Sequence, residues 1–103
     1  MQKTRRLELQ SKLEELLGSK NVYYQPPASV HMAYPAIRYE KVDIDSKYAN
    51  NQKYINKTLY SITVISRLPD DPVIDKILEL PNSSYDRWYP SDNFNHDVIK
   101  LYY

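Results

Sequence analysis

Hydrophobic residues recur along the N-terminal part of the chain with the period of a helix. In residues 4–17, leucines fall at spacings of four, seven and eight, which places them on one helix face: Leu9, Leu13, Leu16 and Leu17. Gly18 follows directly, at the point where a residue in the left-handed conformation would end such a helix. The pattern predicts an amphipathic helix over residues 4–17.

The period then changes to two, which is typical of strands. Residues 22–24 are a short extended run that two prolines stop. After Pro35, Ile37 and Tyr39 alternate with charged residues until the phase slips by one position near Lys41. Such a slip predicts a β-bulge or a break into two strands.

The stretch 57–68 has the strongest strand pattern of the chain. Tyr60, Ile62 and Val64 form one apolar face. The other face is mixed and consists of Leu59, Ser61, Thr63 and Ile65. A strand that is apolar on one side and half apolar on the other is central in a sheet, or has its second side covered by a partner.

The remaining pattern predicts a second helix and two more strands. Asp71 and Pro72 supply an N-cap and a proline at the first helical position, which predicts a helix over 71–80. We expect residues 84–89 to be extended, residues 92–95 to form a turn, and residues 96–103 to form the last strand.

This order of elements predicts one α+β domain over residues 1–103. We expect one twisted mixed or antiparallel β-sheet with both helices packed on one face. Because the helices would lie on the opposite face, they would not cover the mixed face of the central strand or the tyrosine-rich last strand with Tyr102. These two regions are the candidate contact surfaces for a partner. The polar stretch 46–56 predicts a loop that becomes ordered on contact with a neighbour, with Tyr48 and Tyr54 as anchors.

Composition points to interaction and gives little sign of catalysis. The chain has one glycine, so it lacks the glycine-rich loops that cradle phosphates or present a nucleophile. Its 11 tyrosines favour strands and protein interfaces. There is no cysteine, and the formal net charge is +1, so a dedicated nucleic-acid binder is disfavoured. No apolar run predicts a secretory signal or a membrane span, so we expect no membrane partner.

Candidate catalytic residues are few. His31 and His96 are the two histidines, and neither belongs to a metal-binding motif. Glu40, Asp43 and Asp45 form a loose carboxylate group that could gather Mg²⁺ in a small metal-dependent hydrolase. The competing interpretation is a solvated strand edge, whose charged residues discourage aggregation. We therefore expect no catalytic site, no metal and no cofactor, and keep the hydrolase as an alternative.

Four stretches together resemble the tail terminator, or tail-completion, proteins of long-tailed bacteriophages. The resemblance covers about residues 33–103, and the predicted first helix is in a compatible place. The stretches are YPAIRY at 34–39, LYSITVISR at 59–67 followed by the Asp-Pro-capped helix, YDRWY at 85–89, and DNFNHDVIKLYY at 92–103.

The resemblance implies a structural protein of the virion that is located in the tail and neck. During assembly it would be present in the host cytoplasm. Members of that family are mixed α/β subunits without enzymatic activity or cofactor. They form a hexameric ring that caps the finished tail tube and then joins the connector of the head. The implied partners are further copies of the chain, the tail tube protein and the head-side connector, while DNA passes through the ring without specific binding. A head-closure or adaptor protein of the neck is the alternative in the same structural class.

Overall fold

The computed structural model describes residues 2–44 and 58–103 of the chain. It confirms the expected α+β class, with two helices and a five-stranded mixed sheet. The predicted loop over residues 46–56, with Tyr48 and Tyr54, lies outside the described residues. The elements are α1 (Gln2–Leu17), β1 (Val22–Tyr24), β2 (Ala36–Ile44), β3 (Thr58–Ser66), α2 (Pro72–Leu78), β4 (Ser83–Ser91) and β5 (Phe94–Tyr102).

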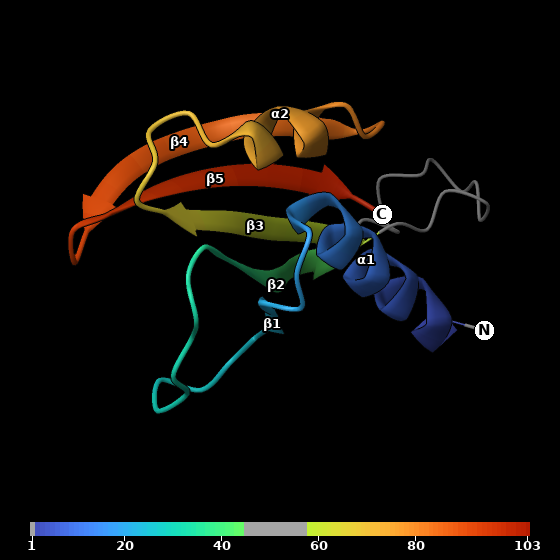
Figure 1. Ribbon diagram of the computed structural model, residues 1–103. Coiled ribbons are helices and arrows are strands. Elements are labelled where there is room, and N and C mark those ends of the chain that lie inside the picture. Colours follow the sequence, from blue (N-terminus) through green and yellow to red (C-terminus); the bar gives the residue numbers. More distant parts are fainter. Residues whose placement is uncertain (1, 45–57) are drawn as a thin grey trace.

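The sheet has the strand order β1-β2-β3-β5-β4, which puts β3 at its centre (Figure 1). β1 runs parallel to β2, and every other pairing is antiparallel. The predicted phase slip near Lys41 is confirmed as a register shift between Lys41 and Asp43. A second shift, between Tyr85 and Arg87, was not predicted.

Both helices pack on the same face of the sheet, as expected (Figure 1). α1 contacts β1 and β2, whereas α2 contacts β4 and β5, so each helix covers one half of the sheet. The predicted face of β3 lies beneath them, with Ile62 and Val64 fully buried and Tyr60 nearly so. Leu9 and Leu13 of α1 and Val73, Ile74 and Ile77 of α2 complete this core.

Local signals in the sequence fix the ends of the helices. Gly18 has φ +83°, and its N–H donates to the carbonyl of Glu14 at 2.9 Å, which closes α1 as predicted. Asp71 caps α2, because its Oδ1 accepts from the N–H of Val73 at 3.0 Å. Its Oδ2 accepts from the Ser66 hydroxyl at 2.9 Å, so the same carboxylate ties the end of β3 to the start of α2. α1 begins two residues earlier than predicted, and α2 ends at Leu78 and not at residue 80.

The predicted four-residue turn over 92–95 is wrong. Asp92 and Asn93 alone form the loop, with φ of 52° and 66°, and Phe94 and Asn95 already belong to β5. Two residues with positive φ match the right-handed twist of a hairpin, and Asp and Asn tolerate that conformation better than most residues. β4 and β5 are therefore one tight hairpin with pairing up to Ser91 and Phe94.

Three tyrosines fill the space between α1 and the sheet. Tyr39 lies between Tyr24 and Tyr60, with ring centroids 4.9 and 5.8 Å away. Its hydroxyl donates to Oε1 of Gln10 at 2.6 Å, which fixes α1 over β2. Burial raises the pKa of Tyr39 and of Tyr60 above the ordinary value of 10.0.

A charge placed under the helices should unfold the protein. We expect Ile62→Asp to abolish cooperative folding, because the carboxylate would be buried on the helix-covered face without a cation. Ile62→Ala should lower the free energy of unfolding by about 2–5 kcal/mol, as measured by urea denaturation. Val42→Asp is the control, because Val42 is 49% exposed and should tolerate the same change. A wild-type melt for Ile62→Asp would show that the core has been misplaced.

Alkaline pH should destabilise the protein through the buried tyrosines. Since folding raises the pKa of Tyr39 and Tyr60, the folded state holds their protons more tightly than the unfolded chain does. Their contribution is complete below about pH 10 and is lost as pH rises through the folded-state values. We expect the urea midpoint to fall above pH 10, and Tyr60→Phe to reduce that fall. Tyr102→Phe, at a surface position, should keep the wild-type profile, and equal profiles for all three proteins would contradict this account.

Candidate functional site

No helix in the described part of the chain covers the second face of the sheet. We call this surface the uncovered face, and it consists of side chains that alternate with the core positions. They are Ala36, Arg38 and Glu40 of β2, Leu59, Ser61, Thr63 and Ile65 of β3, Ser84, Arg87 and Tyr89 of β4, and Phe94, His96, Val98, Lys100 and Tyr102 of β5.

The centre of the uncovered face is buried although no described helix lies on it. Thr63, Ile65 and Val98 are only 3–4% exposed. The register places Thr63 between Arg38 and Val98, at the middle of this face. The accessible part of this face therefore lies around its rim.

The structure brings together some of the contact residues that the sequence pointed to. Leu59 and Tyr102 are register partners on β3 and β5, and Tyr102 is 37% exposed. Ser61 is half-buried and pairs with Lys100. Thr63 and Ile65 lie on the same face but offer little surface to a partner.

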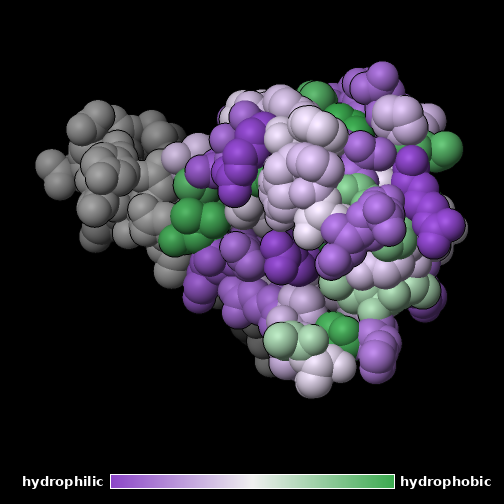
Figure 2. All heavy atoms as spheres, turned by 90° about the vertical axis from the view of Figure 1, so that its left-hand side faces the viewer, coloured by the Kyte–Doolittle hydropathy of each residue, from purple (hydrophilic) through white to green (hydrophobic). Residues whose placement is uncertain are grey.

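Aromatic rings and guanidinium groups gather at the end of the sheet where β4 turns into β5. The rings of Tyr89 and His96 stack with centroids 4.8 Å apart, and the guanidinium of Arg87 lies 5.8 Å from the centroid of Tyr89. The Arg87 side chain is 63% exposed and forms an ion pair of 2.8 Å with Asp86. Exposed arginine beside tyrosine is the composition that protein interfaces favour. Figure 2 faces this end of the molecule and shows small apolar groups separated by polar side chains.

A groove of about 530 Å³ continues this aromatic end. The rings of Tyr34 and Phe94 pack with centroids 4.2 Å apart, and Arg67 lies 5.3 Å from the centroid of Phe94. Tyr34 and Leu68 are 42% and 59% exposed, so apolar surface is available here. The groove is lined by Met32, Ala33, Tyr34, Pro35, Ser66, Arg67, Leu68, Asp71 and Phe94.

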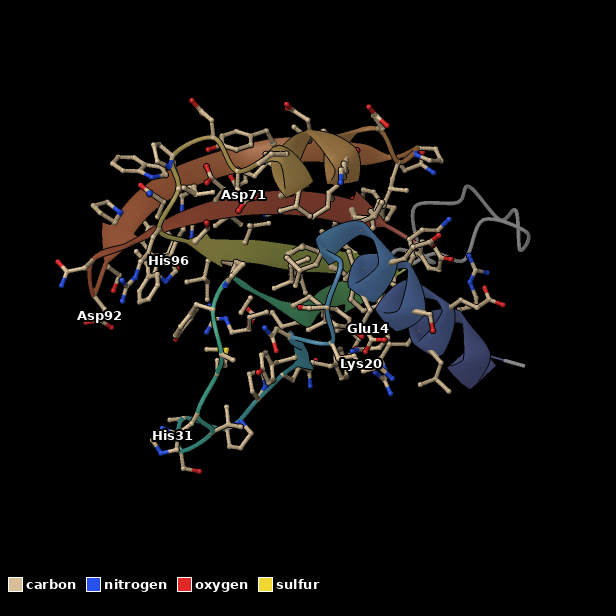
Figure 3. All side chains as sticks on the ribbon, in the orientation of Figure 1. Glu14, Lys20, His31, Asp71, Asp92 and His96 are labelled. Atoms are coloured by element: carbon tan, nitrogen blue, oxygen red, sulfur yellow. The ribbon has the colours of Figure 1, made fainter. Side chains whose placement is uncertain are left out.

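The candidate catalytic residues do not come together. His31 lies at the tip of the loop between β1 and β2, away from His96 on β5 (Figure 3). His96 Nδ1 is 3.3 Å from the carbonyl oxygen of Phe94. Glu40 is exposed on β2, Asp43 follows it near the end of that strand, and Asp45 is outside the described residues. Within residues 2–44 and 58–103, no three His, Asp or Glu side chains are grouped so that they could hold a metal ion.

Alternation alone could not reveal the part that β4 plays in this surface. The register shift between Tyr85 and Arg87 changes which residues of β4 share a face, so Arg87 and Tyr89 reach the uncovered face. The available signal was composition, since YDRWY at 85–89 concentrates aromatic and charged residues in five positions.

Comparison with known proteins adds no relative. No protein-family model, no curated protein and no solved structure matches the chain. In the part that the structure describes, neither helix has the length and apolar character needed to cross a membrane. Among the described residues, the uncovered face with its aromatic rim and the neighbouring groove form the candidate site, and their exposed arginine and aromatic side chains are of the types that protein interfaces favour.

Proposed function

We propose that this protein is a structural component of a bacteriophage virion that caps the tail tube as a ring and provides the surface for joining the head. The proposal starts from the resemblance of residues 33–103 to tail terminator proteins. The observation that carries it is the placement of both helices on one sheet face, which leaves the other face without a helix in the described residues and with an aromatic and cationic rim.

The uncovered face suits a subunit that completes its burial by assembly. Leu59 and Tyr102 present apolar surface beside the half-buried Ser61 and Lys100. Burying such surface contributes about 25 cal/mol per Å², from which the costs of association are subtracted. A subunit of this kind is a monomer when dilute and forms the ring where the tail tube provides a template.

Closure into a ring requires a heterologous interface, in which one patch of a subunit meets a different patch of the next. The number of six subunits comes from the resemblance. The near-neutral charge of +1 suits a ring that DNA crosses without being gripped. The tail tube and the head-side connector are then the partners on the two sides of the ring.

The test is to mix the protein with assembled tail tubes and to image the tube ends by electron microscopy. We expect a ring at one end of each tube. Leu59→Glu should reduce capping at least tenfold, because it places a charge in the contact surface, whereas Leu7→Glu should cap normally. Leu7 is a suitable control, since it is an exposed leucine of α1 on the other side of the sheet.

Thermal melting of both variants would show that they are folded. If the wild-type protein never caps a tube and forms no ring, the tail terminator assignment fails. Binding to isolated head connectors in place of tubes would then identify a head-closure or adaptor protein.

A further inference from the structure

A second hollow lies on the other side of β4, facing the helices. It has a volume of about 280 Å³, and we call it the β4 notch. Two aromatic side chains form its walls, Trp88 at 53% exposure and Tyr85 at 46%. The remaining lining residues are Pro69, Asp70, Asn95 and Asp97.

The register shift in β4 builds this notch. Tyr85 pairs with Ile99 and Trp88 with Asp97, so both rings fall on the helix side although they are three positions apart. The indole N–H of Trp88 donates to Oδ1 of Asn95 at 3.0 Å, which holds the ring in place. The walls of the notch are thus positioned before any partner arrives.

Asp97 places a buried carboxylate in the notch. It is only 8% exposed, and its Oδ1 accepts from the hydroxyl of Tyr85 at 2.6 Å. This bond raises the pKa of Tyr85 to about 12, so the hydroxyl keeps its proton well into the alkaline range. Within the described residues, Oδ2 of Asp97 has no hydrogen-bond donor and no cation pairs with the carboxylate. The Tyr85 hydroxyl is a neutral partner, whereas a buried charge is normally also paired with an opposite charge.

We infer that the β4 notch receives an arginine side chain from a second copy of this chain. A guanidinium group is flat enough to stack on Trp88 and can donate two hydrogen bonds to the carboxylate of Asp97. Asp70 at the notch adds a second negative charge. The combination of an aromatic wall and a buried carboxylate selects a cation over a neutral side chain of the same size.

The uncovered face of the same chain supplies suitable cations. Arg38, Arg87 and Lys100 lie on it, beside Glu40. These cations are on the opposite side of β4 and β5 from the notch, so a copy cannot insert them into its own notch. The contact therefore runs from the face of one copy to the notch of the next, which is the heterologous geometry of a ring. The identity of the neighbour rests on the proposed function, whereas the preference of the notch for a cation does not.

The first experiment tests the notch by itself. Trp88 is the only tryptophan of the chain, so its fluorescence reports on this site alone. Titration of the full chain with argininamide should change the fluorescence saturably at about millimolar concentration, as expected for a ligand of this size. Citrullinamide, which has the same shape and α-amino group but a neutral urea in place of the guanidinium, should have no effect. Asp97→Asn, checked by thermal melting, should weaken the argininamide response at least tenfold.

Equal responses to argininamide and citrullinamide would overturn the assignment of the notch. An unchanged response in Asp97→Asn would overturn it as well. Tyr85→Phe provides a second folded variant if Asp97→Asn melts early, and it should also weaken the response, because Asp97 loses the donor that positions it.

The second experiment identifies the occupant by mixing two defective variants. Asp97→Asn keeps its cations but has a defective notch, whereas a variant with Arg38→Gln, Arg87→Gln and Lys100→Gln keeps its notch but lacks the donors. In sedimentation velocity at high concentration, wild type should form assemblies larger than a dimer, and each variant alone should remain monomeric. An equimolar mixture should form a dimer and stop there, because only one of its two interfaces is intact.

The two proposals fail in different ways. Rings of Asp97→Asn on tail tubes, or a mixture that remains monomeric, would overturn the notch contact and leave the proposed function standing. Wild-type assembly that depends on Asp97, without capping of any tube, would support the notch contact and overturn the tail terminator assignment.

Discussion

Burial of one face of β3 under both helices is the interaction on which the rest of the structure depends. β3 is the central strand, and its Tyr60, Ile62 and Val64 meet α1 from one side and α2 from the other. Two helices of this length cover one face of a five-stranded sheet and no more. The same packing that makes the core therefore leaves the second face without a helix in the described residues.

The uncovered face and the β4 notch follow from this one-sided arrangement. The centre of the uncovered face is buried, whereas Tyr102 at its rim is 37% exposed. The β4–β5 hairpin extends the surface to both sides, with Arg87 on the uncovered face and Trp88 in the notch. Strand alternation puts the adjacent residues Arg87 and Trp88 on opposite faces, and the register shift adds Tyr85 to the side of Trp88. The hairpin is therefore cationic on one side and acidic with aromatic walls on the other. Such a pair of patches suits head-to-tail association of identical subunits.

Sequence patterns predicted those parts of the fold that regular periodicity and local caps control. The leucine spacing gave α1, Gly18 and Asp71 gave helix ends, and the alternation around Ile62 gave the covered face. The shift near Lys41 was predicted, because regular alternation on both sides of it reveals the change of phase. The shift between Tyr85 and Arg87 was not predicted, because residues 85–89 mix aromatic and charged side chains without a clear alternation. The two-residue turn at Asp92 and Asn93 was also missed. Both residues adopt positive φ there, but Asp and Asn are common in longer turns too, so their presence does not indicate the length of the turn. For the site, Leu59 and Tyr102 could be placed on one face, whereas the meeting of Trp88 with Asp97 depends on strand register.

The central claim is that the uncovered face is the surface through which this protein assembles. The most direct measurement is hydroxyl-radical footprinting of the protein, free and bound to tail tubes, read out by mass spectrometry. The account predicts that Tyr89 and Tyr102 lose reactivity on binding while Leu7, on the outer side of α1, keeps it. Protection of Leu7 with unchanged reactivity of Tyr89 and Tyr102 would contradict it.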